Sequence, residues 1–424
     1  MSMQINKIFA VVLLFSVQFI FANEQYMTSY EDLGSNSTSS HEPAIVIYSN
    51  DCLSMPSVIV SIVFRVGKLD VSIAKSGIVE IIAKNLINKE TDNRLMDLGI
   101  TYSVNCTDTD TEICAHMHPK NIKKFFELMK DITQSIKVEN LEICKRRIII
   151  EKKLINYGKY NSVSDNIFAQ IYPQIVFNES TLQTITVDDI KNFFDEYYRN
   201  NVALITICGN FGKEILTKQD FNDIKKNFGG SSQRTSLSDI NFLKDRYIHI
   251  ENKFERNSVN YVYTISDQKY KKLAPVFLSI FSYELFKTFI QNQSLLSSFF
   301  SDFYIHREND IILVSLYPKK DISLSEVKKL YKILVQKIST KEISKEILSK
   351  IAEIKRVSID AQNYDMYKIH SRVKEKIIGG ISSNETTLVR AIESVSPKEL
   401  NEFALKILYE QPKLEIITQY RSDR

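Results

Sequence analysis

Residues 185–211 read ITVDDIKNFFDEYYRNNVALITICGNF, and residues 394–420, SVSPKELNEFALKILYEQPKLEIITQY, repeat their pattern. Each stretch begins with a Thr or Ser that is followed three positions later by an acidic residue, as at a helix N-terminus. Apolar residues at helical spacing, a short polar break and a β-rich run come next. Because the two stretches lie about two hundred residues apart, we expect a duplicated domain.

The boundary between the two copies is visible in the composition. Residues 229–240 read GGSSQRTSLSDI, a polar Gly/Ser-rich stretch that is typical of a linker. We therefore predict an N-terminal domain at 43–228, a linker at 229–245 and a C-terminal domain at 246–424. Strand-like and helix-like segments are mixed in both halves without strict alternation, which favours an α+β fold.

The N-terminus has the pattern of an export signal. Lys7 precedes the apolar run IFAVVLLFSVQFIFA, and polar residues follow it. This run of fifteen residues is shorter than the ~20 that a membrane-spanning helix needs, so we expect a signal peptide at 1–22, with an uncleaved anchor as the alternative. Residues 23–42 are polar and Ser-rich and are predicted to form a flexible leader. The mature protein should be periplasmic or secreted, with no membrane span after signal cleavage.

Charge and cysteine content exclude some functional classes. The 55 basic and 51 acidic residues are interspersed and give a net charge of +4, which is no electrostatic footprint for nucleic acid. Five cysteines do not make a disulfide framework. Cys106 and Cys114 flank the turn-like TDTDT, and both a disulfide across a hairpin and two free thiols fit this spacing.

A short apolar helix is expected at SGIVEIIAKNL, residues 76–86. It carries Glu80, Ala83 and Lys84 on one side, which is unusual in an otherwise apolar segment. Since Glu80 precedes Lys84 by four residues, the two side chains can pair along a helix.

The order of segments resembles the pitrilysin/insulinase (M16) family of zinc peptidases, which includes the mitochondrial processing peptidase. The resemblance covers roughly residues 45–420. It rests on FRVGKLD (64–70), RLMDLGITYSVNCTDTDTEI (94–113) and the duplicated stretch at 185–211. It implies two α/β-roll domains of the LuxS/processing-peptidase-like type, each with a mixed, mostly antiparallel sheet and helices on one face.

Active members of that family carry His-x-x-Glu-His on the helix that matches residues 76–86. Two histidines four residues apart bind one Zn²⁺ from one helix face, and the glutamate takes a proton from the zinc-bound water. In this chain Glu80 and Lys84 stand at the histidine positions, Ala83 stands at the general base, and Glu151 best matches a later glutamate ligand. Alanine cannot accept a proton and an ammonium has no lone pair. The resemblance therefore implies neither zinc, nor another cofactor, nor peptidase activity at this site.

A second departure lies in the C-terminal half, where active assemblies supply an arginine and a tyrosine that grip the substrate. The matching stretch, FIQNQSLLSSFF at 289–300, contains neither residue type. We also consider what replaces the metal: if Glu151 points toward Lys84, the ammonium would lie between two carboxylates in a buried cluster. A solvated pair of Glu80 and Lys84 is the alternative.

Another metal-binding pattern is CAHMHP, in which Cys114, His116 and His118 alternate. On a strand these side chains share one face and could hold Zn²⁺ or Cu⁺. The alternative is a polar sheet face, with Ile113, Ala115 and Met117 packed in the core on the other side.

Two functions from different classes follow. The first is an exported M16 peptidase homologue without the zinc site, which binds extended peptides or acts as the non-catalytic partner of an active M16 subunit in a heterodimer; a homodimer is a variant. The second is a zinc-dependent M16 metalloendopeptidase with rearranged ligands drawn from Glu80, Glu151, His116 and His118. The second requires zinc as a cofactor and a general base that the sequence does not show.

Overall fold

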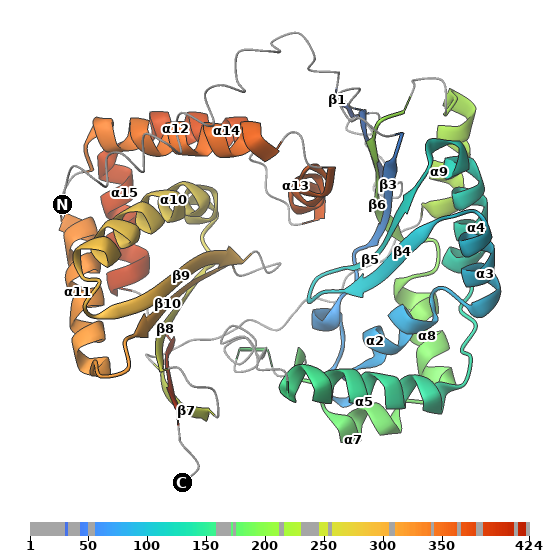
Figure 1. Ribbon diagram of the computed structural model, residues 1–424, viewed down its shortest axis with the longest axis horizontal. Coiled ribbons are helices and arrows are strands. Elements are labelled where there is room, and N and C mark those ends of the chain that lie inside the picture. The colour runs from blue at the N-terminus through green and yellow to red at the C-terminus, as the bar shows by residue number, and fades with distance from the viewer. Residues whose placement is uncertain are drawn as a thin grey trace.

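The computed structural model describes two sheets that are each covered by helices (Figure 1). The residues described are 30–32, 43–49, 56–157, 171–172, 175–211, 216–229, 246–252, 257–304, 310–340, 343–362, 366–378, 385–410 and 414–420. The predicted signal peptide, Cys52 and most of the predicted linker lie outside these ranges.

The first domain is built on a six-stranded sheet with the order β1-β2-β6-β3-β5-β4. Its strands are Tyr30–Asp32 (β1), Ala44–Ser49 (β2), Val58–Phe64 (β3), Thr101–Cys106 (β4), Thr111–Met117 (β5) and Val202–Gly209 (β6). Its helices are Lys68–Asp70 (η2), Ile73–Lys75 (η3), Ile78–Asn85 (α2), Lys89–Asp97 (α3), Pro119–Asn121 (η4), Ile122–Gln134 (α4), Leu141–Tyr157 (α5), Glu179–Thr184 (α7), Val187–Tyr197 (α8) and Lys218–Phe228 (α9).

The second domain is built on a five-stranded sheet with the order β7-β11-β8-β10-β9. Its strands are Arg246–Asn252 (β7), Ser258–Ile265 (β8), Leu296–Tyr304 (β9), Asp310–Pro318 (β10) and Leu414–Tyr420 (β11). Its helices are Gln268–Gln291 (α10), Leu324–Thr340 (α11), Lys345–Gln362 (α12), Met366–Ile378 (α13), Glu385–Ser394 (α14), Pro397–Phe403 (α15) and the π-helical Ala404–Glu410 (η6).

The two sheets share one topology. In the first, β2 runs parallel to β6, and the pairs β3–β6, β3–β5 and β4–β5 are antiparallel. In the second, β7 runs parallel to β11, and the pairs β8–β11, β8–β10 and β9–β10 are antiparallel. The predicted α+β class with two mixed, mostly antiparallel sheets is confirmed.

Strand alternation gives the first sheet two faces of different character. One face packs against the helices, and its buried residues include Val60 and Ile62 of β3, Ile113 and Ala115 of β5, and Ile207 of β6. The opposite face, here called the inner face, is turned toward the second domain in Figure 1. The register places Ser61 of β3 between Thr206 of β6 and Cys114 of β5, with Ser103 of β4 beyond.

Both copies of the opening stretch form a capped helix followed by a strand. Thr186 and Asp189 form a capping box at the start of α8, and Ser396 and Glu399 form one at the start of α15. In each box the hydroxyl satisfies a backbone N–H that has no partner within the helix. The predicted helix starts are confirmed.

Helix α10 is the one described helix that is long and apolar enough to cross a membrane: an 18-residue window within Lys269–Gln291 has a mean hydropathy of 1.4. Packing within the second domain explains this composition, because Ala274, Phe277, Ile280 and Phe281 are buried in its core. The apolar run of α10 therefore belongs to a folded core.

Several expectations need correction. Residues 30–32 of the predicted flexible leader pair with β2 as a short strand. Residues 289–300 cover the end of α10 and the start of β9. Cys106 pairs with Thr111 and Cys114 with Ser103, three positions apart along the hairpin. The two thiols therefore point to opposite faces of the sheet and both are free, which excludes the disulfide between them.

The two domains meet in an apolar cluster. Leu69, Ile171 and Tyr172 of the first domain pack on residues of the second sheet, which are Val262, Ile311, Leu313, Leu414 and Ile416. Asp310, the first residue of β10, is 5% exposed. Burial raises the pKa of its carboxyl to about 6, although the Lys271 ammonium acts in the opposite direction.

Replacing Ser396 by Ala should lower the free energy of unfolding by about 1 kcal/mol, because the cap of α15 is lost. Chemical denaturation measures the effect. Ser394→Ala is the control, since this hydroxyl donates only a long bond of 3.4 Å to the Ala391 carbonyl. An equal loss in both variants would contradict the capping role.

The buried Asp310 should make stability depend on pH. Its folded pKa of about 6 exceeds the ordinary value near 3.9, so the folded state holds the proton more tightly. Stability should therefore fall as pH rises from about 4 through 6. We expect Asp310→Asn to gain in melting temperature over the wild type at pH 8 relative to pH 5. The exposed Asp321→Asn should show no such difference, and a flat result for both would contradict this account.

Candidate functional site

Helix α2, which the sequence resemblance aligns with the family's metal-binding helix, begins at a glycine for a structural reason. Gly77 adopts a φ of 98°, in the left-handed region, and a Cβ atom there would lie 2.6 Å from Cδ1 of Leu182 in α7. A side chain at this position would be strained and would collide. Gly77 thus allows α2 to begin in close contact with Leu182 of α7.

Helix α5 is fixed against α2 by a buried asparagine. The Asn85 amide donates to the Ile81 carbonyl at 2.8 Å and to Cys144 Sγ at 3.4 Å. Its oxygen accepts from the Glu139 backbone N–H at 3.2 Å. These bonds set the position of α5, and with it the position of Glu151 two turns further along.

The structure brings Lys84 and Glu151 together. Lys84 Nζ donates to Glu151 Oε1 at 2.8 Å, and the two side chains are 45% and 51% exposed. An ammonium bound to a carboxylate offers no lone pair to a metal and repels a cation. The donor set at positions 80, 84 and 151 therefore does not fit Zn²⁺.

Glu80 lies on another side of this site. Its charge acts on Lys68 and Cys106, and burial together with the Glu80 charge raises the pKa of the Cys106 thiol to about 11. Glu80 and Lys84 are not within ion-pair distance. The three-charge buried cluster considered from the sequence is thus absent from the described residues, and a half-exposed pair of Lys84 with Glu151 is present instead.

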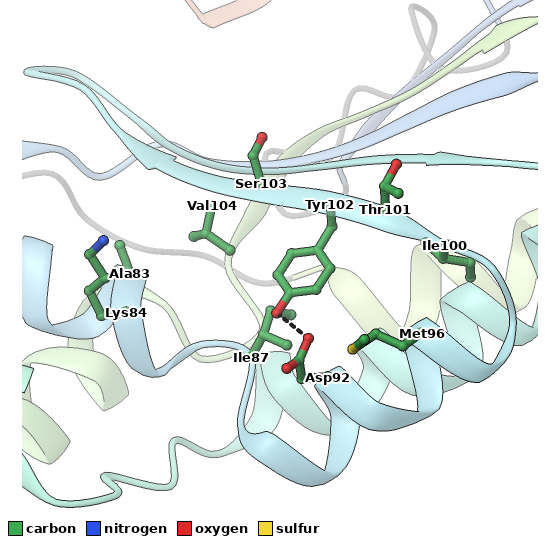
Figure 2. Close-up of a pocket in the computed structure, with 10 residues that line it drawn as sticks. All are labelled: Ala83, Lys84, Ile87, Asp92, Met96, Ile100, Thr101, Tyr102, Ser103 and Val104. Carbon is green, nitrogen blue, oxygen red and sulfur yellow. Dashed lines mark hydrogen bonds between the residues drawn. The ribbon is translucent and has the colours of Figure 1, made fainter.

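A pocket of about 510 Å³ adjoins this pair (Figure 2). It lies between α2, α3 and β4, and the Tyr102 ring crosses it to donate a hydrogen bond of 2.8 Å to Asp92. Its lining residues are Ala83, Lys84, Ile87, Asp92, Met96, Ile100 and Thr101–Val104. Strand β4 lies at the edge of the sheet, so its outer backbone groups are not paired within the described sheet. Because the Ala83 side chain is small, it fills little of the pocket on the α2 side.

The Cys114, His116 and His118 row is not a three-ligand site. Cys114 and His116 lie on the inner face, but β5 ends at Met117 and His118 instead accepts a hydrogen bond from the Lys120 backbone at the start of η4. His116 Nε2 lies 2.5 Å from Ser57 Oγ. Ile113, Ala115 and Met117 are buried in the core on the other face, as the alternative interpretation had it.

The structure does not bring together the rearranged ligand set of Glu80, Glu151, His116 and His118 either. His116 pairs with Thr101 at one end of β4, whereas Glu80 acts on Cys106 at the other end. Five residues of antiparallel strand span ~17 Å. Among the residues described here, no group of three or more His, Cys, Asp or Glu side chains is placed to hold a metal ion.

A polar network on the inner face was not predicted from the sequence. It consists of Ser61, Asp110, Glu112, Thr206, His370 and Lys374. Strand alternation could have added Glu112 to the row of Cys114 and His116. Its partners in α13 are more than two hundred and fifty residues away, and no local pattern indicates them.

Comparisons with known proteins concern the C-terminal part of the sequence and the fold. Residues 184–355 match the family model described as the peptidase M16 inactive domain. A search of curated proteins gave no match. The fold is similar to a protease from Helicobacter pylori, with a TM-score of 0.74 and 15% identity, covering 93% of this chain and 100% of that one.

Two further solved structures share the fold. The peptidase M16 inactive domain from Pseudomonas fluorescens has a TM-score of 0.71 and 13% identity, with 90% of this chain and 96% of that chain covered. The periplasmic protease PqqL from Escherichia coli has a TM-score of 0.65 and 10% identity, with 94% of this chain but 48% of that chain covered. The M16 resemblance is confirmed: residues 184–355 match an M16 family model, and the chain shares the fold of solved M16-like structures.

The matched segment and α2 are separate parts of the chain. The family model begins at Thr184, beyond Glu80, Ala83, Lys84 and Glu151. The loss of the His-x-x-Glu-His motif is therefore read from the sequence and from the Lys84 contact.

Lys84→Ala should change the free energy of unfolding by less than about 1 kcal/mol, because half-exposed ion pairs contribute little. Thermal denaturation checks this. Lys153→Ala is a matched control, since Lys153 forms a similarly exposed pair with Glu179 at 3.2 Å. A large loss in Lys84→Ala alone would instead indicate a structural ion cluster.

Proposed function

We propose that this protein is an exported, non-catalytic M16 homologue that binds extended peptides and serves as the partner subunit of an active M16 peptidase. The observation that carries the first half of this proposal is the 2.8 Å contact between Lys84 and Glu151. It fills the matching ligand positions with an ion pair. With Ala83 at the base position, water activation on a metal has neither the metal ligands nor the proton acceptor.

Peptide binding is supported by the edge of the first sheet. An extended peptide can add a strand to a free edge, where main-chain bonds give affinity and alternate side-chain pockets give selectivity. Strand β4 is such an edge. Residues Thr101–Val104 all border the pocket, but only the Tyr102 and Val104 side chains point into it, while those of Thr101 and Ser103 point the other way, toward the inner face (Figure 2). An apolar peptide side chain would enter the pocket, with the peptide backbone beside β4.

The partner role is supported by size. This chain covers about half of PqqL, with 48% of that chain aligned. In the family that the sequence resembles, two two-domain halves close around a chamber, and one of them can lack the metal. We propose that an active subunit supplies the second half here, and that an export signal at 1–22 brings this chain to the same compartment.

The alternative is a metalloendopeptidase with rearranged ligands. It would need Glu80, Glu151, His116 and His118 to converge, and the described residues keep the histidines at the far end of β4 from Glu80. Metal content and chelator-sensitive cleavage separate the two functions.

The purified protein should contain no stoichiometric zinc and should show no chelator-sensitive peptide hydrolysis. The combined variant Glu80→His, Ala83→Glu and Lys84→His should bind about one zinc per chain, because two histidines and Glu151 then form a three-ligand site. Elemental analysis after dialysis against zinc measures the zinc content of both proteins, and a peptide hydrolysis assay with and without chelator measures the activity.

The same variant with Glu151→Gln is the control and should lose most of its zinc. Stoichiometric zinc with chelator-sensitive cleavage in the wild type would overturn the proposed function. Failure of the combined variant to bind zinc, in a folded protein, would overturn the assignment of residues 80, 84 and 151 to ligand positions.

A further inference from the structure

Helix α13 of the second domain lies between the two domains and contacts the inner face of the first sheet (Figure 1). His370 Nε2 lies 2.5 Å from Glu112 Oε1, and His370 Nδ1 lies 2.8 Å from Thr206 Oγ1. Lys374 Nζ donates to Glu112 Oε2 at 2.7 Å and to Asp110 Oδ1 at 3.0 Å. One turn of α13 thus joins β5, the β4–β5 turn and β6 of the other domain.

This contact is polar and largely ionised. The Ser61 hydroxyl also donates to Glu112, at 2.7 Å, so both oxygens of this carboxylate are bound. Burial would raise the pKa of Glu112, but the bonds and charges of His370 and Lys374 lower it to about 2. Asp110 and Glu112 together raise the pKa of Lys374 against the effect of burial. Glu112 therefore stays ionised beside the Lys374 ammonium above about pH 3.

The same atoms resemble a hydrolytic triad in their connectivity, with Thr206, His370 and Glu112 in the three roles. Thr206 is fully buried in a strand that is paired on both sides, so its hydroxyl cannot reach a substrate. The network is consequently an interdomain contact.

The apolar part of this contact is small. In α13, Val373 packs on Val46, Val63 and Leu204 of the first sheet, with Ala44 beside them. The other interdomain cluster is larger and apolar, and its first-domain members are Leu69, Ile171 and Tyr172. The two domains are therefore joined at one place by apolar burial and at another mainly by charges and hydrogen bonds.

We propose that α13 is a latch and that the apolar cluster around Tyr172 is the hinge about which the domains open. Water can solvate the carboxylates and the ammonium of the latch when it opens, whereas opening the hinge would expose buried apolar surface. Interfaces with few buried apolar contacts open at lower free energy. The latch holds the inner face of the first sheet against the second domain. The latch proposal is independent of the peptide binding proposed above.

Removing one partner of a buried ion pair leaves an uncompensated charge, so the latch should be sensitive to single substitutions. Lys374→Met leaves Asp110 and Glu112 facing each other without the ammonium. A matched control exists in the second domain, where Lys337 donates to the buried Glu284 at 3.0 Å within a single domain. Lys337→Met removes the same kind of bond without touching the interdomain contact.

Hydrogen exchange of the full chain, followed by mass spectrometry, tests the latch together with small-angle scattering. In Lys374→Met we expect the amides of α13 to exchange roughly ten-fold faster or more and the radius of gyration to increase. In Lys337→Met the exchange of the α13 amides and the radius of gyration should both match those of the wild type. Glu112→Gln should repeat the Lys374→Met result, which guards against a variant that fails to fold.

Two results would overturn the latch. Unchanged α13 exchange in both Lys374→Met and Glu112→Gln would show that the network does not hold the helix. Faster α13 exchange without a change in scattering, or the same changes in Lys337→Met, would show local loosening in place of domain opening.

Discussion

A strand in a sheet presents two faces, and in this protein only one face of each sheet is covered by helices of its own domain. On the first sheet, the remaining face carries Ser61, Thr206 and Glu112, all of them buried. Buried polar groups are costly unless they are bonded. Ser61 donates to Glu112, and helix α13 of the second domain bonds Thr206 and Glu112. The pairing of Glu112 with His370 and Lys374 therefore couples the two halves of the chain.

The Lys84–Glu151 contact, in contrast, joins two helices of the first domain, α2 and α5. Its geometry follows from α2 and α5, which Asn85 and Cys144 hold together. An ion pair in half-exposed surroundings adds little to stability, so the site is not maintained as a structural cluster. The position is better described as a wall of the pocket beside β4, with an alanine where the family places its general base.

Much of the fold could be predicted from local signals. The capping boxes at Thr186 and Ser396, the alternation in residues 111–117 and the apolar spacing in α4 each lie within a few residues of one another. The sequence alone does not locate the start of β9, because its Ser-rich sequence carries a weak strand signal next to an apolar helix. The sequence alone does not decide the sheet faces of Cys106 and Cys114, because a register shift of a single residue exchanges the two faces of a strand.

The candidate site divides in the same way. Glu80, Ala83 and Lys84 lie within five residues on one helix, so their departure from a metal-binding pattern is visible in the sequence. The partner of Lys84 is 67 residues away, and that of Glu112 is 258 residues away. Such contacts depend on how the elements pack against one another, and neither the periodicity nor the composition of the sequence predicts this packing. His118 shows the complementary case, in which strand alternation was extended one residue beyond the end of β5.

The central claim is that an ammonium–carboxylate pair occupies the place that zinc would take. The most direct measurement is a crystal structure from crystals grown with excess zinc, with diffraction collected at the zinc absorption edge. The account predicts Lys84 bonded to Glu151 and no anomalous peak between α2 and α5. A strong peak there, coordinated by Glu80 and Glu151 with Lys84 displaced, would contradict it.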